Sequence, residues 1–184
     1  MTIIEKVQEH VKEQCQKDTN IFTMEAYDSH FVSVVKYAKE LATKRKADIE
    51  ITELSAWLHD IGSIMGDSEN HHITGANYAE KLLKSFNYPQ DKIDKIKHCI
   101  ISHRGSKNIA RESVEAECLA DADALSHFDD VHGLFRLALI SKKLDTTTAK
   151  QFVYAKLERS WNKLSDEAKQ IIRPKYEAAK ILFG

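Results

Sequence analysis

The chain has 184 residues, a length typical of one domain that can bury a substantial core without disulfides. Six Gly and two Pro are far fewer than average, which excludes most hairpin-rich sandwiches and barrels and argues against disordered tails. The formal net charge of −1 excludes a strongly basic nucleic-acid surface, and nine His stand out as the feature to explain.

Apolar residues recur at helical spacing along almost the whole chain. In the N-terminal half the spacing predicts one helix over roughly 24–44 and three more marked by apolar positions within 54–61, 76–86 and 93–103. Thr52 is the expected N-cap of the second helix and Gly62 its expected stop. Pro89 suits the first turn of the fourth helix. Residues 66–70 and 104–108 are expected to form loops.

Four further helices are expected at about 112–127, 130–143, 147–163 and 166–182. Thr146 and Ser165 are the expected caps of the last two, and Pro174 should kink or split the final helix. No repeat, low-complexity run or linker interrupts the chain. We expect a single all-α domain over 1–184, a helical bundle whose core of about 24–130 carries the motifs while 130–184 packs on it.

Three cysteines, an odd number, form no C-x-x-C pair, which favours a reducing cytosol over a disulfide framework or a thiolate zinc site. Charged residues interrupt the first ten positions, where a secretory signal needs an apolar run, and no stretch approaches about 18 apolar residues. We therefore expect a cytoplasmic protein with no membrane span.

The adjacent pair His59-Asp60 is the first feature with chemical meaning. Neighbouring helical residues project about 100° apart, so both side chains can reach one metal ion or one substrate. A lone His-Asp pair is more often an ordinary surface pair at a helix end. Its interpretation therefore depends on whether other donors accompany it.

Further donors recur on separate predicted helices. His30 and His103 lie on the apolar faces of their helices, where each buried ring nitrogen needs a partner, either a metal or a hydrogen-bonding group. His71 and His72 begin another helix, where free N–H groups attract phosphate. The string LADADALS over 119–126 supplies carboxylates on yet another. Four or five helices can thus each offer a donor to one centre.

Taken in this order, the motifs resemble the HD superfamily of metal-dependent phosphohydrolases, with the small stand-alone branch as the nearest pattern. The strings are SHFVSVVKYAKELA around His30, LSAWLHDIG around the dipeptide, HHITGANYAEKLL after it, CIISHRG at His103, and LADADALS. They cover about 28–130, more than half of the chain. The Gly-Tyr-Pro motif of relatives that cleave cyclic dinucleotides is absent from the sequence.

The resemblance implies that His30, His59, Asp60 and one aspartate of Asp-Ala-Asp bind one metal ion. Asp123 is preferred because it stands in the family's Ala-Asp-x-Leu pattern, although helical geometry alone does not decide. Asp121 would then orient a histidine or face solvent. Two imidazoles and two carboxylates suit Mn, Fe, Co, Ni or Zn and leave positions open for water.

His71, His103 and Asp60 are the predicted catalytic residues. The two histidines would bind a second metal ion or protonate the phosphate and the leaving group. His71 is preferred over His72 because a His precedes Gly-Ala by four residues in the family pattern, whereas the helical wheel mildly favours His72. The predicted substrate-binding residues are Arg104, Lys107 and His72, and for the two cations a solvated loop position is the alternative.

The other histidines and the charges of the last two helices carry no assigned function. His98 points away from its apolar stripe and should be exposed, whereas His127 should lie close to Asp123. The stretch Lys156-Leu157-Glu158-Arg159 is interpreted as a solvated helix face.

The resulting prediction is a metal-dependent phosphohydrolase that uses one or two divalent ions and metal-activated water on a small phosphorylated metabolite, expected to be a nucleotide. One alternative is a di-iron oxygenase on the same fold, and another is a non-catalytic nucleotide-binding or regulatory module. Long nucleic acids fit poorly, since no basic groove is indicated. A homodimer is expected by analogy alone.

Overall fold

The computed structural model describes residues 1–104 and 109–184, and over these residues it contains helices and no strand. In chain order the elements are α1 (Ile3–Cys15), the π-helix η1 (Ala26–Phe31), α2 (Val32–Arg45), α3 (Ile49–Leu58), α4 (Ile61–Ile64), α5 (His71–Ser85), α6 (Gln90–Ser102), α7 (Val114–Ser126), α8 (Val131–Arg136), the π-helix η2 (Leu137–Ser141), α9 (Thr146–Lys163) and α10 (Asp166–Phe183). The predicted all-α class is confirmed.

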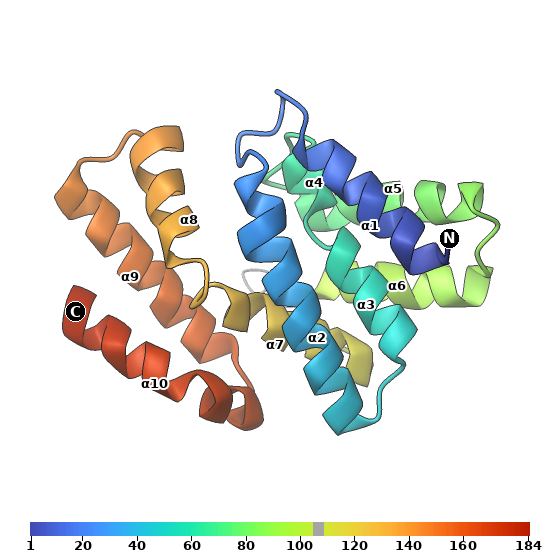
Figure 1. Ribbon diagram of the computed structural model, residues 1–184. Coiled ribbons are helices and arrows are strands. Elements are labelled where there is room, and N and C mark those ends of the chain that lie inside the picture. The colour runs from blue at the N-terminus through green and yellow to red at the C-terminus, as the bar shows by residue number, and fades with distance from the viewer. Residues whose placement is uncertain (105–108) are drawn as a thin grey trace.

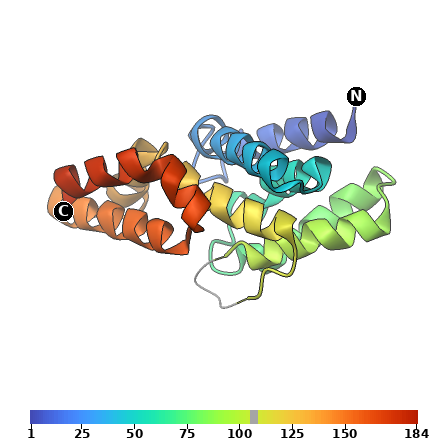
Figure 2. The ribbon, with the colours of Figure 1, turned by 90° about the horizontal axis from the view of Figure 1, so that it is seen from below.

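Helices α2 and α7 form the middle of the molecule and pack against each other. In Figure 1, α1, α3, α5 and α6 lie on the right of this pair, and α8, α9 and α10 lie on the left. Figure 2 shows the two chain ends on opposite sides, as Figure 1 does. No helix in 1–104 or 109–184 is long and apolar enough to cross a membrane.

Helix α7 is buried from Cys118 to Ser126 because it contacts α2, α3, α6, α9 and α10. Its alanines at alternate positions are small enough for helices to approach closely on several sides. Asp121 and Asp123 are buried with it, at 2% and 7% exposure. A buried carboxylate is costly unless it is paired, so each of these aspartates must have partners from other elements.

Asp121 is held by residues that the sequence does not place near it. Arg45 at the end of α2 approaches its Oδ2 to 2.7 Å, and the backbone N–H and hydroxyl of Ser165 donate to its two oxygens. The sequence analysis predicts that Asp121 orients a histidine or faces solvent. Among the described residues it does neither, because Arg45 and Ser165 hold its carboxylate. It joins α2, α7 and the start of α10.

Several helix ends differ from the predicted ones. Asp48 caps α3 by accepting the Ile51 N–H, whereas Thr52 is fully buried inside the helix and donates its hydroxyl to the Asp48 carbonyl. Likewise Asp145, and not Thr146, caps α9. An aspartate one or more residues upstream competes successfully because its carboxylate accepts free N–H groups at the positive helix end.

The remaining boundaries are closer to expectation. Ser165 caps α10 as predicted, and Pro89 is the N-cap residue of α6, one position before its first turn. α10 runs through Pro174 without splitting. The predicted helix over 130–143 is divided into α8 and η2. His98 is partly buried and accepts the N–H of Glu112, so its expected exposure was wrong.

Candidate metal centre

Six side chains of types that can bind a metal ion meet in one cluster, although they come from distant parts of the chain. They are His30 on η1, His59 and Asp60 between α3 and α4, His71 at the start of α5, His103 at the end of α6, and Asp123 on α7. These are the positions that the sequence motifs single out. Their proximity supports the predicted site, while their roles remain proposals.

The dipeptide His59-Asp60 lies at a break between two helices, not within one. Helix α3 ends at Leu58, and Asp60 has φ −109° and ψ 14°, which turns the chain before α4 begins. Gly62 is therefore not the stop that the sequence predicted. A Cβ on Gly62 would lie 2.6 Å from the carbonyl oxygen of His71, so this glycine allows α4 to contact the first turn of α5 and brings His71 beside Asp60.

Backbone carbonyls fix the orientation of three histidine rings. His59, His71 and His103 each place Nδ1 on the carbonyl oxygen three residues earlier, at 2.8, 3.0 and 2.5 Å. A carbonyl can only accept, so Nδ1 carries the proton in each ring. The Nε2 atom is then left with a lone pair, which is the form of imidazole that binds a metal.

His30 is oriented in the same way through a hydroxyl group. Its Nδ1 lies 3.1 Å from Oγ of Ser126, and that hydroxyl donates its own proton to the carbonyl of Asp123 at 2.8 Å. Ser126 must therefore accept the Nδ1–H of His30. The lone pair of His30 Nε2 is directed toward the cluster, as in the other three rings.

The Nε2 atoms of His30 and His59 lie only 3.1 Å apart. With both Nδ1 protons engaged, two facing lone pairs would repel each other unless a proton or a metal ion lies between them. Burial lowers the pKa of His59 to about 4, so this ring is neutral at pH 7. Burial also opposes the charging of His30, but Asp60 and Asp123 outweigh it and raise the pKa of His30. The pair thus attracts one positive charge.

The side chains of the cluster form two groups of donors. One group is His30, His59 and Asp123, and the other is Asp60, His71 and His103, in which Asp60 is the member that also approaches the first group. Oδ2 of Asp60 is 3.6 Å from Nε2 of His30, and Oδ1 is 3.4 Å from Nε2 of His71. Burial opposes its ionisation, yet the surrounding imidazoles keep the pKa of Asp60 well below its usual range. This carboxylate can therefore face both groups as an anion.

The donor set fits a divalent transition ion. It consists of imidazole nitrogens and carboxylate oxygens, which suit Mn, Fe, Co, Ni or Zn. All three cysteines are buried, and none belongs to either donor group. Each donor group by itself offers three ligands, so an ion held there would keep positions for water or substrate.

Of the three predicted substrate-binding residues, two lie beside the cluster and one lies outside the described residues. His72 is buried, and its Nδ1 is 3.3 Å from a guanidinium nitrogen of Arg104, so it belongs to neither donor group. Arg104 also donates to the carbonyl of Glu69. Lys107 lies outside the described residues.

Two cavities include residues of the cluster in their walls, and they share Asp60, His127 and Lys156. The polar cavity has a volume of about 490 Å³, and the apolar cavity is smaller, about 170 Å³. The polar cavity is lined by Asp60, His71, His103, Arg104, Asp123 and His127, together with the α9 residues Lys156, Arg159, Ser160, Asn162 and Lys163. The walls of the apolar cavity include Phe22, Phe31, Ile64, Leu134 and Leu137.

Sequence reasoning missed the part that α9 plays at this site. Lys163 Nζ is 3.1 Å from Asp123, and Lys156 is partly buried and lines both cavities, so a solvated face is the wrong interpretation for it. His127 was correctly placed near Asp123, with 3.7 Å between Nε2 and Oδ1. The spacing of Lys156, Arg159 and Lys163 puts them on one helical face, and that was the available signal.

Comparison with known proteins identifies the fold. The HD domain family pattern matches residues 27–127, and no curated protein matches the chain. Bacillus subtilis YpgQ, solved in complex with ADP, is 19% identical with a TM-score of 0.69, and the alignment covers 95% of this chain and 90% of YpgQ. An HD-superfamily hydrolase from Bacillus thuringiensis is 21% identical, with a TM-score of 0.71 and coverages of 97% and 91%.

A third solved structure, from Lactobacillus plantarum, is 17% identical, has a TM-score of 0.78, and aligns over 98% of this chain and 92% of its own. At identities this low the likeness establishes the shared helical fold. Activity must be argued from the site.

Proposed function

The chain belongs to the HD domain family, and on that premise we propose that it is a metal-dependent phosphohydrolase acting on a small phosphorylated metabolite, with a nucleotide as the expected class. The strongest support is the convergence of four imidazole Nε2 atoms on Asp60 and Asp123, with each ring oriented through its Nδ1. A purely structural histidine cluster has no need to present so many lone pairs to one point.

His30, His59, Asp60 and Asp123 would hold the first ion. A bound divalent ion supplies an activated water near neutral pH and polarises a phosphoryl oxygen. The chain's own task is to keep the four donors in place, through the bonds at Nδ1 and the helix break after Leu58.

His71 and His103 have two possible tasks in the proposed reaction. Together with Asp60 they form the second donor group and would hold a second ion. With one ion bound, a ring that carries a proton on Nε2 as well as on Nδ1 would instead donate the Nε2 proton to the leaving oxygen and return to the neutral form, since both line the polar cavity where that oxygen would depart. Metal analysis of the purified protein distinguishes one equivalent from two.

A nucleotide is favoured over other phosphorylated metabolites for two reasons. The cluster borders both a polar cavity lined by cationic side chains and a second cavity with aromatic and aliphatic walls. In addition, YpgQ, a protein with the same fold, was solved with ADP. A nucleotide offers both a charged phosphate chain and a flat, weakly polar base.

The test is a screen of nucleoside mono-, di- and triphosphates with Mn²⁺, Co²⁺, Ni²⁺ or Mg²⁺, in which phosphate and pyrophosphate are measured separately. We expect turnover that requires the metal and that Asp60→Ala abolishes, while His132→Ala, an exposed histidine away from the cluster, retains it. Absence of turnover with every metal and substrate would contradict the proposal. Iron content and oxygen uptake would then test the di-iron oxygenase.

A further inference from the structure

Helix α9 presents three cations to the polar cavity. Lys156, Arg159 and Lys163 are spaced by three and four residues, so they share one face of the helix, and all three line this cavity. Figure 1 shows α9 on the C-terminal side of the molecule, and it contacts α7, which carries Asp123. The helix lies outside residues 27–127, the part that the family pattern covers.

Two of these cations make no direct contact with a counter-ion in the described part of the chain, although the charges of Asp123 and Asp60 act on Lys156 at longer range. Across 1–104 and 109–184, neither the Lys156 ammonium nor the Arg159 guanidinium makes an ion pair or hydrogen bond, whereas Lys163 pairs with Asp123 at 3.1 Å. Lys156 is partly buried, so its charge is only partly hydrated. A cation without a direct partner in such a wall is stabilised when an anion enters the cavity.

The number of positive charges on α9 indicates how much negative charge the bound anion carries. Asp60 and Asp123 would neutralise a divalent ion between them, and this would release Lys163 from its pairing with Asp123. Lys156, Arg159 and Lys163 then offer three positive charges to the ligand. A single phosphate monoester carries about −2 at most near pH 7, so it leaves part of this wall unmatched.

We propose that the cationic face of α9 binds the linked phosphates of a substrate that has two or more of them, an inference that rests on the proposed phosphohydrolase function. Lys163, 3.1 Å from Asp123, and Lys156, which lines both cavities, would meet the phosphate at the metal centre. The exposed Arg159 lines the polar cavity alone and would meet the outer phosphates. The non-phosphate part of the substrate extends into the apolar cavity, against Phe22 and Phe31.

Kinetics on two classes of substrate test the inference. We compare the wild type, Arg159→Gln and Lys156→Gln on nucleoside triphosphates and on p-nitrophenyl phosphate, which has one phosphate. Lys150→Gln is the matched control, an exposed lysine on the same helix. Loss of a charge-assisted hydrogen bond lowers kcat/KM for triphosphates by about tenfold in Arg159→Gln, with less than about a twofold change on p-nitrophenyl phosphate. Lys156→Gln should lower kcat/KM on both substrates. For Arg159→Gln, equal loss on both substrates, or no loss on triphosphates, would overturn the inference.

Binding of inorganic polyphosphate gives a second reading that needs no turnover. In isothermal titrations of the metal-loaded protein, inorganic tripolyphosphate should bind at least about tenfold more tightly than orthophosphate, and Arg159→Gln should remove most of this difference. Equal affinities in the wild type would refute the role of α9. If the metal-loaded protein hydrolyses p-nitrophenyl phosphate but binds tripolyphosphate and orthophosphate with equal affinity, the inference about α9 fails while the proposed function stands. If tripolyphosphate binds selectively but the protein hydrolyses no substrate, the inference about α9 stands while the proposed function fails.

Discussion

The hydrogen bond at Nδ1 decides which nitrogen of each histidine is free to bind a metal ion. The carbonyls that hold Nδ1 of His59 and His103 belong to the preceding helical turn, and the one that holds His71 belongs to the turn before α5, so the neutral tautomer with a bare Nε2 is built into the local backbone. His30 depends instead on Ser126, from another helix. The donor atoms are therefore preorganised by hydrogen bonds at the far side of each ring.

Removal of a central donor should abolish metal binding without unfolding the chain. His59→Ala removes a member of the first donor group, and Asp60→Ala removes the carboxylate that faces both groups. We therefore expect the first ion to fall below about a tenth of an equivalent after dialysis, given the 10- to 100-fold losses typical even of outer-shell changes. Helical content by far-UV circular dichroism should persist. His132→Ala, at 63% exposure, is the control. A full equivalent of tightly bound metal in either variant would show that the assignment is wrong.

The two aspartates of Asp-Ala-Asp should differ in what their loss costs. Asp123→Asn should weaken metal binding and also weakens one ion pair, with Lys163. It should cost less stability than Asp121→Asn, which weakens contacts to both Arg45 and Ser165. Asp121→Asn should retain the metal but lower the free energy of unfolding by about 2 kcal/mol, because Arg45 is left partly buried beside a neutral group. Urea denaturation and metal analysis on both variants measure this. The reverse pattern would make Asp121 the ligand.

At the scale of helices, short irregular segments position the site. The π-helix η1 carries His30, and the break between α3 and α4 carries His59 and Asp60. Both deviate from the regular helix that apolar periodicity predicts. Irregular turns of this kind are frequent at functional sites because they direct neighbouring side chains to places that a straight helix does not reach.

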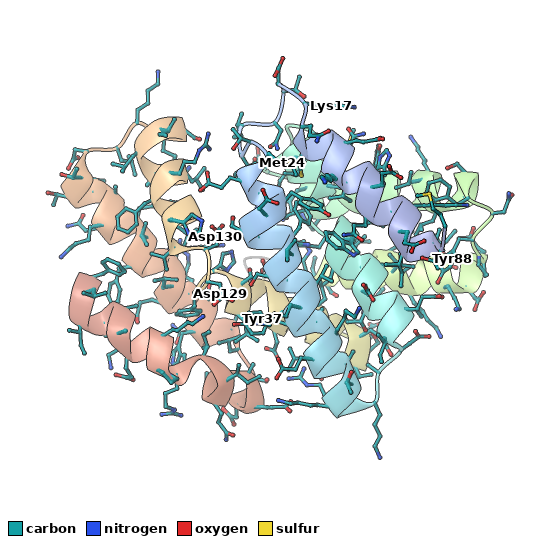
Figure 3. The ribbon with its side chains drawn as sticks, viewed as in Figure 1. Lys17, Met24, Tyr37, Tyr88, Asp129 and Asp130 are labelled. Atoms are coloured by element: carbon teal, nitrogen blue, oxygen red, sulfur yellow. The ribbon has the colours of Figure 1, made fainter. Side chains whose placement is uncertain are left out.

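The segment between α7 and α8 attaches α2 to α10 through Asp129. Figure 3 shows Asp129 and Tyr37 between these parts of the molecule. The Asp129 carboxylate accepts from Ser33 at 3.0 Å and pairs with Lys175 of α10. Burial opposes its ionisation, but Lys175, Tyr37 and Ser33 outweigh burial and lower the pKa of Asp129.

This lowered pKa predicts a stability difference that depends on pH. Because the folded pKa lies below the unfolded value of about 3.9, the contribution is full above about pH 4 and is lost as the pH falls through the folded value. Asp129→Asn should therefore reduce the free energy of unfolding by about 1 kcal/mol at pH 7, and the difference from wild type should shrink below pH 4. Urea titrations at pH 7 and pH 3.5 measure it, with the exposed Asp18→Asn as control. A constant difference at both pH values would exclude this linkage.

At the scale of the whole molecule, the site closes only when distant helices pack together. The histidines and Asp60 come from η1 and the region between α3 and α6, Asp123 comes from α7, and the cationic wall comes from α9. A metal ion bound there would therefore join elements across the molecule. Its binding to the folded chain stabilises that chain by mass action.

Metal should raise the melting temperature, and a chelator should reverse the rise. At a free ion concentration 100 times Kd the stabilisation is about 2.7 kcal/mol, which corresponds to about 5 to 10 °C for a chain of this size. Thermal denaturation with Mn²⁺ or Ni²⁺, with and without EDTA, measures it. The shift should disappear in His59→Ala and persist in His132→Ala. An equal shift in both variants would place the ion elsewhere.

The sequence alone indicated the all-α class and the family, and the structure and the family match confirm both. It also singled out the six side chains that meet in the cluster, because short motifs and apolar periodicity are local properties of the chain. Capping residues were less predictable, since Thr52 and Thr146 had nearby aspartates that bind the free N–H groups better.

Only the tertiary structure decided how those residues divide the work. Asp60 faces two groups of histidines, Asp121 pairs with Arg45 from 76 positions earlier, and Lys156 turns toward the cluster and not to solvent. Each of these contacts joins residues far apart in the chain, and their pairing follows from how helices pack around the buried α7. The pattern of the sequence identifies donors one helix at a time, whereas the electrostatic partner of a buried charge is set by whichever helix lies opposite.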